Sequence, residues 1–256
     1  MDFLKTGNDL PLDQFRDTLI RLEDTIIFAL IERAQFATNN SIYQVGKFKF
    51  EDRANVSFLE YILHELEISH AKVRRYTSPD EYPFTSNLPE PILPPLDYPK
   101  ILHPNNININ KKLYEIYIQK IVPTICAHGD DLNYGTSATR DVECLQALSR
   151  RIHYGKFIAE AKFNDPELHD QYVQLIKARD SQGIYDLLTN LAVEEKLLKR
   201  LRHKASIYGQ DISTDGAIPD KVSKIAVDAV IDLYKDYVIP LTKEVEVEYL
   251  LMRLDE

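Results

Sequence analysis

The sequence predicts an all-α protein, a single-domain multi-helix bundle spanning residues 1–256 with long helices near its N-terminus and its C-terminus. Apolar residues recur at helical spacing along most of the chain, and no stretch shows a convincing strand pattern. The composition, 44% apolar and 28% charged, is that of a folded globular protein. A length of 256 residues suits one large domain.

The first half of the chain predicts three helices. One is expected at 12–36, where apolar residues from Phe15 to Leu30 step along one side. A second is expected at about 56–76. The third covers YEIYIQKIVPTI, and Pro123 should end or kink it because proline lacks a backbone N–H.

The second half predicts a helix that starts near Thr139 and contains SRRIHYGKFIAEAKF, with Asp141 and Glu143 in its first turn. Shorter helices are expected at 166–179, 181–188 and 189–208. The last is long, about 223–254, with Pro240 interrupting its middle. The segment VEVEY (245–249) alternates like a strand but lies inside this helical window, so we expect a helix there.

Residues 77–110 stand apart, because they hold eight of the thirteen prolines. Such a segment cannot form regular structure. It is either a long ordered loop over the surface, which is uncommon enough to suggest a role, or a plain spacer.

Charge and motifs exclude several classes of function. The net charge of −9 argues against a nucleic-acid surface, so an anionic ligand must be held by a few placed cations. Cys126 and Cys144 form no CxxC pair, which disfavours a zinc site or a disulfide framework. The sequence has no HExxH, phosphate-binding glycine loop or Gly-x-Ser-x-Gly motif, and we expect neither a metal nor a cofactor.

The N-terminal stretch MDFLKTGNDLPLDQF has no apolar run typical of a signal peptide. No segment approaches the roughly 18 apolar residues of a membrane span. We therefore expect a cytoplasmic protein that contacts no membrane.

One stripe of the helix that contains Arg151 is unusual for an acidic protein. Arg151, Gly155, Ile158 and Lys162 share a face, and the two cations lie about 16 Å apart along the axis. A glycine inside a helix costs about 1 kcal/mol relative to alanine. Either a tight helix crossing or the close approach of a ligand would compensate, and from the residues alone the crossing is the commoner cause.

Three other helices also place polar groups beside an apolar stripe. Asn190 and Glu194 form one i, i+4 pair, and Thr242 and Glu246 form another. In the first helix, Arg16 shares a stripe with Glu23 at the border of the core. Each pair alone is typical of an exposed helix face. Their recurrence on four helices predicts a polar pocket in the core of the bundle, a common place for bundle sites.

Three of these stretches carry a family resemblance. SATRDVECLQALSRRIHYGKFIAEAKF, IPLTKEVEVEYLLMRLDE and RDTLIRLEDTIIF closely resemble the fungal, allosteric type of chorismate mutase, and the likeness runs nearly from end to end. The resemblance implies an all-α homodimer whose subunits each hold an active site in a helix bundle. It implies the rearrangement of chorismate to prephenate, on the route to phenylalanine and tyrosine, without cofactor or metal.

The resemblance also implies a substrate site. The matching positions are Arg16, Arg151, Lys162, Asn190, Glu194, Thr242 and Glu246. Arg16 and Arg151 would bind the two carboxylates of chorismate, with Asn190 and Thr242 adding neutral hydrogen bonds, while Glu194 would accept the ring hydroxyl.

Lys162 and Glu246 would donate hydrogen bonds to the ether oxygen, where negative charge grows as the C–O bond breaks. A carboxylate cannot donate, so Glu246 must be protonated for this role. Burial beside an anionic substrate would raise its pKa.

Fungal members of the family bind tyrosine as an inhibitor and tryptophan as an activator at the dimer interface. The matching positions are Arg74, Arg75, Asn133, Gly135, Thr136 and Thr139, and we expect a regulatory loop at 126–138. Backbone amides at a helix start, together with arginines, suit an amino-acid carboxylate. Arg74 and Arg75 could instead only complement a helix dipole.

Three departures from the family pattern concern regulation. Thr136 stands where serine is common, Leu132 replaces a polar residue, and Ala226-Val227 replaces Thr-Pro at the start of the last helix. Two interpretations without catalysis also fit parts of the sequence: a helical scaffold that binds partner helices, and a homologue that has lost activity. Neither predicts that Arg16, Arg151, Lys162 and Glu246 occur together.

Overall fold

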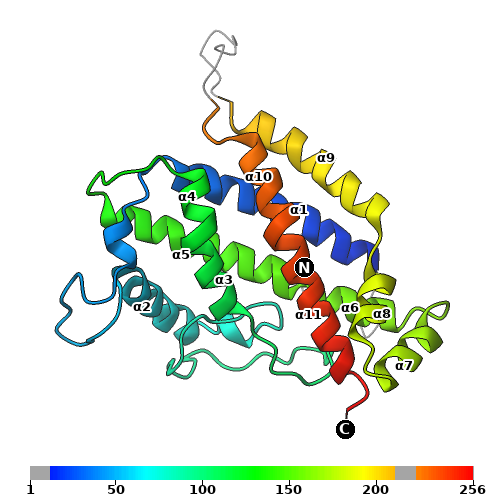
Figure 1. The fold of residues 1–256 in the computed structure, drawn as a ribbon. Coiled ribbons are helices and arrows are strands. Elements are labelled where there is room, and N and C mark those ends of the chain that lie inside the picture. The colour runs from blue at the N-terminus through cyan, green and yellow to red at the C-terminus, as the bar shows by residue number, and fades with distance from the viewer. Residues whose placement is uncertain (1–11, 211–222, 256) are drawn as a thin grey trace.

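The structure is a computed structural model that describes residues 12–210 and 223–255. Within these residues the regular elements are all helical, which confirms the predicted fold class (Figure 1). Those before residue 130 are α1 (Leu12–Ala34), the 3₁₀ turn η1 (Asn40–Tyr43), α2 (Phe58–Lys72), the 3₁₀ turn η2 (Arg75–Thr77), α3 (Asn110–Ile116), the π-helical turn η3 (Tyr117–Ile121) and α4 (Val122–Ile125).

The second half of the chain holds the longer run of packed helices. Its elements are α5 (Tyr134–His153), α6 (Gly155–Phe163), α7 (His169–Lys177), α8 (Ser181–Leu188), α9 (Leu191–Tyr208), α10 (Val227–Leu233), the π-helical turn η4 (Tyr234–Val238) and α11 (Ile239–Met252). The segment VEVEY lies within α11, as predicted.

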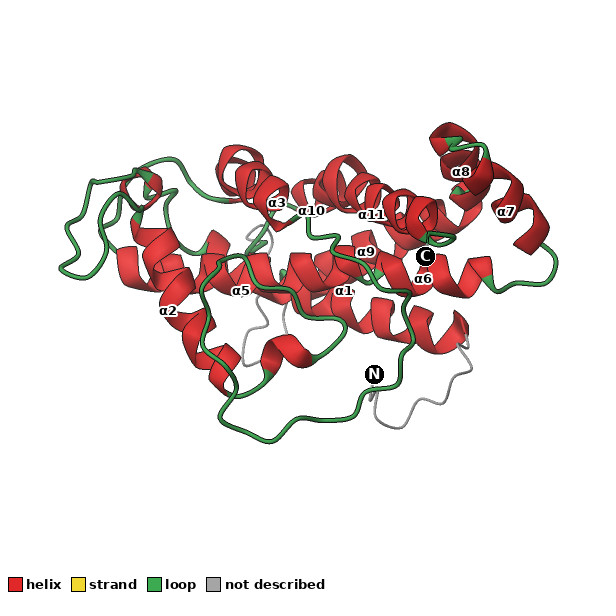
Figure 2. Ribbon diagram, turned by 90° about the horizontal axis from the view of Figure 1, so that it is seen from below, coloured by secondary structure: helices red, strands yellow, loops and turns green. Residues whose placement is uncertain are grey.

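The helices α5 and α6 run through the middle of the molecule, and the others pack around them. α1 and α2 pack against α5, α11 packs against α6, and α10 packs against α9. In Figure 2 α3, α10 and α11 form one layer above α5, α6 and α1. α1 also contacts α6 and α9, and α11 also contacts α5, so these five helices adjoin one another.

The apolar stripes that predicted the helices form two clusters of buried side chains. The larger one runs through most of the bundle and includes Ile26 and Leu30 of α1. The smaller one lies between α1 and α6, and its members are Phe15, Leu22, Ile101, Tyr154, Phe157 and Ile158. Burial of such side chains, at about 1.5–3 kcal/mol each, holds α1 against α6.

The prediction that α5 starts near Thr139 is wrong, because the helix begins at Tyr134. The Asp131 carboxylate accepts hydrogen bonds from the Asn133 and Ala37 backbone N–H groups, at 2.9 and 2.8 Å, and this turn leads directly into the helix. Asp141 is therefore not in the first turn: it is buried and pairs with Arg33. The expected loop at 126–138 accordingly ends at Asn133.

The continuous helix predicted through residues 149–163 is divided at Tyr154, with α5 before it and α6 after it. The tyrosine ring is fully buried against Phe15 and Phe157. Because the break is a single residue, Arg151 and Lys162 still share a face.

Neither predicted proline break stops its helix. Pro123 is the second residue after η3, and Pro240 is the second residue after η4, so each is the second residue of the next α-helix. An α-helical proline loses one hydrogen bond and clashes with the carbonyl four residues earlier. The wider π turn takes up both effects, so the helices continue to Ile125 and Met252.

The proline-rich segment is free of helix and strand from residue 78 to residue 109, and it is a packed part of the molecule. We call residues 98–109 the strap, because they bind α5, α6 and α11. The Lys156 ammonium donates to the Ile107 carbonyl at 2.6 Å, and the Ile109 N–H donates to His153 Nε2 at 3.1 Å. Figure 2 shows the loop extending along the bundle to the end where α6 lies. The ordered-loop alternative is therefore the right one.

In residues 12–210 and 223–255, no helix is both long enough and apolar enough to cross a membrane. Cys126 and Cys144 are both free and buried.

Candidate active site

One cavity of about 210 Å³ opens between α1, α5, α6, α9 and α11. All seven residues predicted for the substrate site line it, so the structure brings together the side chains that were expected to converge. Its lining residues are Arg16, Leu19, Arg151, Ile158, Lys162, Leu188, Asn190, Val193, Glu194, Leu197, Ile239, Thr242, Lys243 and Glu246. The lining combines apolar side chains with a few charged and polar groups, as is usual for a site that binds a small polar molecule.

Arg151 of α5 brings a spare donor to this cavity. Its side chain is buried, and one terminal nitrogen donates to the Thr242 hydroxyl at 3.3 Å. That hydroxyl in turn donates to the Val238 carbonyl at 2.6 Å, in the last residue of η4. Within the described residues, the buried Nε of Arg151 has no hydrogen-bond partner. A buried unpaired donor is costly, and an anionic ligand would satisfy it.

Gly155 marks a tight crossing of α6 over α11, which resolves the two alternatives for this glycine. A β-carbon placed there would lie 3.0 Å from the Thr242 side chain and 3.1 Å from Cγ of Glu246. The crossing and the site are therefore linked, because the glycine lets two residues of the cavity approach α6.

Glu246 is buried one helical turn after Thr242. Burial raises the pKa of its carboxyl above the usual range, and the negative charge of Glu194 raises it further. The cations of Lys162 and Arg151 act in the opposite direction on this pKa. The net upward shift of the pKa is in the direction that favours the protonated carboxyl, the form that can donate a hydrogen bond.

Lys162 of α6 reaches the same cavity from the side of α8. Its ammonium donates to the Leu188 carbonyl at 2.9 Å, and the side chain is half-buried. An ammonium has three donors, so it can bind the backbone and still donate to a ligand.

The start of α9 supplies two more polar groups. Asn190 caps this helix: its side-chain oxygen accepts from the Val193 N–H at 3.2 Å, which leaves the amide N–H groups to donate. The carboxylate of Glu194, one turn later, pairs with Lys243 of α11 at 2.6 Å.

α1 supplies Arg16, whose exposed side chain lies at the rim of the cavity. Glu23, predicted to border the core on the same stripe, is fully buried and does not line the cavity. It pairs with Arg200 at 2.7 Å and with Lys204 at 3.2 Å. This pairing ties α1 to α9.

Sequence reasoning missed Lys243. Its ammonium contacts Glu194, donates to the Thr189 hydroxyl at 2.9 Å and lies 4.7 Å from the centre of the Tyr185 ring. Its position directly after Thr242, beside a charged motif of the predicted site, was the only available signal.

The residues predicted to bind effectors fall in two separate places. Arg74 has a φ of +69° and donates to the Pro94 carbonyl, while Arg75 pairs with Glu81 at 3.1 Å and donates to Gln146 at 3.0 Å. Asn133, Gly135, Thr136 and Thr139 are exposed at the start of α5. Gln146 lies about 10 Å along α5 from Thr139, so one chain does not bring the two groups together.

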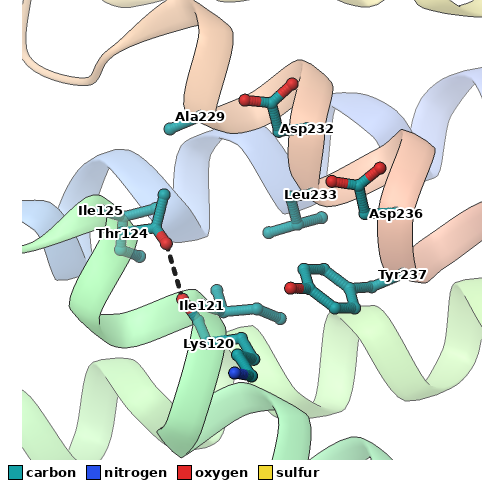
Figure 3. A pocket seen from close by; sticks show the side chains of 9 residues that line it. All are labelled: Lys120, Ile121, Thr124, Ile125, Ala229, Asp232, Leu233, Asp236 and Tyr237. Carbon is teal, nitrogen blue, oxygen red and sulfur yellow. Dashed lines mark hydrogen bonds between the residues drawn. The ribbon is translucent and has the colours of Figure 1, made fainter.

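A second hollow of about 200 Å³ lies between η3–α4 and α10–η4 (Figure 3). It is lined by Lys120, Ile121, Thr124, Ile125, Ala229, Asp232, Leu233, Asp236 and Tyr237. None of the residues predicted for a site lies there.

Comparison with known proteins adds to this geometry. The family model described as chorismate mutase type II matches residues 133–247. The chorismate mutase of Schizosaccharomyces pombe is 54% identical, with 96% of this chain and 97% of that protein covered. The chorismate mutase of Saccharomyces cerevisiae is 48% identical, with the full length of both chains covered.

Solved structures agree with these similarities. The Aro7p chorismate mutase of Candida albicans, in complex with L-Trp, superposes with a TM-score of 0.92 at 45% identity over 100% of this chain and 96% of that chain. AtCM1 with tyrosine bound in its allosteric site gives a TM-score of 0.87 at 48% identity, with 96% of this chain and 97% of that chain covered.

Proposed function

The chain belongs to the chorismate mutase family, and we propose that the cavity between α1, α5, α6, α9 and α11 is where it rearranges chorismate to prephenate. The observation that carries this proposal is the buried Nε of Arg151, which has no hydrogen-bond partner within the described residues, in a residue that lines one cavity together with the other six predicted residues. Chorismate is a dianion, and arginine matches the planar geometry of a carboxylate.

Each polar group of the cavity binds a different part of the substrate. Arg151 and Arg16 bind the two carboxylates, Arg151 from a buried position and Arg16 from the rim. The amide of Asn190 donates in addition, because its oxygen is held by the helix cap. Thr242 acts mainly by orienting Arg151. The Glu194 carboxylate accepts a hydrogen bond from the ring hydroxyl.

Two donors then stabilise the transition state. In the rearrangement a C–O bond breaks while a C–C bond forms, and negative charge grows on the ether oxygen. The Lys162 ammonium and the protonated Glu246 carboxyl donate to this oxygen. No residue attacks the substrate covalently, so the rate comes from holding the reactive conformation and from donors already in place.

An ultraviolet assay of chorismate loss tests the proposal. Arg151→Met should lower kcat/KM by a factor of about 10³ or more, because it removes a charged contact to a carboxylate. Arg150→Met is the matched control: the neighbouring arginine pairs with Asp80 at 2.6 Å and does not line the cavity. Equal losses in the two variants would contradict the assignment. If the chain were a scaffold or an inactive homologue, the wild-type protein itself would consume no chorismate in this assay.

We also propose that the chain forms a homodimer regulated by tyrosine as inhibitor and tryptophan as activator. The supporting observations are the exposed start of α5, which lacks a side-chain cap, and the separate position of Arg75. A free helix N-terminus suits a carboxylate. Because one chain does not unite these groups, a site between two subunits is the arrangement that would.

Rates against chorismate concentration, with and without tyrosine or tryptophan, test this second proposal. Arg75→Met should abolish the response to both amino acids while the rate without effector changes little. A sedimentation measurement checks the dimer. Unchanged rate curves for the wild-type enzyme would remove the regulatory claim and leave the catalytic one intact.

The remaining part of the proposal is a cytoplasmic location. Two free thiols, at Cys126 and Cys144, are compatible with a reducing compartment. Fluorescence microscopy of the tagged full-length chain would test it.

A further inference from the structure

We propose that Lys243 is a positioning residue of this reaction, which holds Glu194 and the start of α9 in the geometry that binds the ring hydroxyl of the substrate. The inference rests on the proposed function of the cavity. In this proposal Lys243 of α11 does not itself bind the substrate, and it acts by holding Glu194 in place.

The contacts of Lys243 join three elements at the mouth of the cavity. Its ammonium lies 2.6 Å from Oε1 of Glu194 in α9 and donates to the Thr189 hydroxyl, just after α8, at 2.9 Å. The ring of Tyr185 in α8 lies 4.7 Å from the same nitrogen. Lys243 therefore fixes the segment that carries both Asn190 and Glu194.

Burial makes this ion pair stronger than a surface pair. The Lys243 side chain is 10% exposed and that of Glu194 is 25% exposed. Exposed ion pairs contribute little because water screens them, whereas a partly buried pair with a second hydrogen bond holds one geometry. A carboxylate has about four acceptor positions, so pairing at Oε1 leaves acceptor capacity for a hydroxyl.

Lys243 also balances charge inside the cavity. Without it, Glu194 would place an uncompensated negative charge beside a dianionic substrate, and like charges disfavour binding. The same ammonium acts on Glu246, because its positive charge lowers the pKa of that carboxyl. Lys243 thus acts on Glu194, the acceptor for the ring hydroxyl, by direct contact, and on Glu246, the protonated donor, through its positive charge.

The test compares Lys243→Met with Lys243→Arg in the full-length enzyme, using kcat, KM and their pH dependence. Lys243→Met should lower kcat/KM by about tenfold or more, since a charged hydrogen bond to Glu194 is lost. The alkaline limb of its profile of kcat/KM against pH should move to higher pH, because Glu246 loses a positive neighbour and the pKa of the Glu246 carboxyl rises. Lys243→Arg keeps the charge and should keep the wild-type limb. Lys235→Met, at an exposed position of η4, is the matched control and should leave both quantities unchanged.

A double variant separates positioning from a general structural role. If Lys243 acts through Glu194, Lys243→Met combined with Glu194→Gln should be no slower than Glu194→Gln alone. Should Lys243→Met not fold, Lys243→Gln keeps the hydrogen-bonding capacity without the charge and should still move the alkaline limb.

Two results would overturn the inference: a Lys243→Met enzyme within twofold of wild type with an unmoved limb, or losses that add fully in the double variant. Failure of the proposed function is a different result. It would be seen as no chorismate consumption by the wild-type chain, or as an Arg151→Met variant of full activity.

Discussion

Gly155 of α6 and Thr242 of α11 approach so closely that a β-carbon on the glycine would lie 3.0 Å from both the Cγ2 and the carbonyl oxygen of the threonine. The hydroxyl of the same threonine accepts a hydrogen bond from Arg151. The glycine that permits the helix crossing therefore also sets the position of a carboxylate-binding arginine. Packing and chemistry are connected at this one contact.

Gly155→Ala should displace α11 by a few tenths of an ångström and lower kcat/KM about tenfold or more, because small misplacements of catalytic groups are costly. Stability should change by about 1–2 kcal/mol at most, since overpacking opposes the better helix propensity of alanine. Steady-state kinetics and urea unfolding measure the two effects. Adding Thr242→Ser removes the clashing methyl group but keeps the hydroxyl, and should restore part of the activity. A single variant with wild-type kinetics would show that the crossing does not set the site.

Activity should fall as pH rises through the raised pKa of Glu246, because its carboxyl donates only while it is protonated and burial raises this pKa. Activity must fall and not rise with pH, because above the raised pKa the carboxylate is an anion beside the ether oxygen and the donor is lost. Glu246→Gln donates at every pH, so its profile of kcat/KM against pH should be flat on the alkaline side. Glu244→Gln, at a half-buried position of the same helix that pairs with Lys112, should keep the wild-type profile. A Glu246→Gln enzyme with an unchanged alkaline limb would contradict the role.

The convergence of the cavity residues could be predicted from the sequence because they sit beside helical stripes. Arg151 and Lys162 keep their common face even though Tyr154 divides the helix, since a single-residue break hardly changes the helical phase. Lys243 could not be found this way. It follows Thr242 by one position and so points about 100° away from it, and only the fold shows that α8 and α9 lie there.

Helix boundaries and breaks are harder to predict from the sequence than the faces that converge. The start of α5 depends on Asp131, whose carboxylate accepts from Ala37, a residue far away in sequence. Pro123 and Pro240 each predict a break locally, but a π turn precedes each of them and absorbs the lost hydrogen bond. Such features are decided by tertiary packing, which a helical period does not encode.

Asp141→Asn should destabilise the fold by about 3–5 kcal/mol, because it would leave the guanidinium of Arg33 buried without its counter-ion. Both side chains are fully buried with an Nε–Oδ1 distance of 2.6 Å, and the hydroxyls of Tyr43 and Tyr117 donate to the same carboxylate. Urea unfolding measures the loss. Glu143→Gln, which breaks an exposed pair with Arg140 on the same helix, should cost under about 0.5 kcal/mol. Similar losses in the two variants would refute the prediction.

Lys156 holds the strap against α6. Its ammonium is fully buried, donates to the Ile107 carbonyl and lies 4.0 Å from the centre of the Tyr82 ring. Burial lowers the pKa of this lysine to about 7, although the charge of Glu248 opposes the shift. The neighbouring His153 accepts from the strap at Nε2, and burial together with Lys156 lowers its pKa to about 4.

Stability should therefore rise with pH between about 7 and 10. In this window the native lysine is neutral while the unfolded lysine stays protonated, so the unfolded state binds more protons and an increase in pH disfavours it. A neutral amine still donates to the Ile107 carbonyl, so the strap stays bound. Lys156→Met should remove this part of the pH dependence, whereas Lys112→Met, at an exposed position of α3, should retain it. Urea unfolding at several pH values measures the slope, and equal slopes in Lys156→Met and the wild type would disprove the assignment.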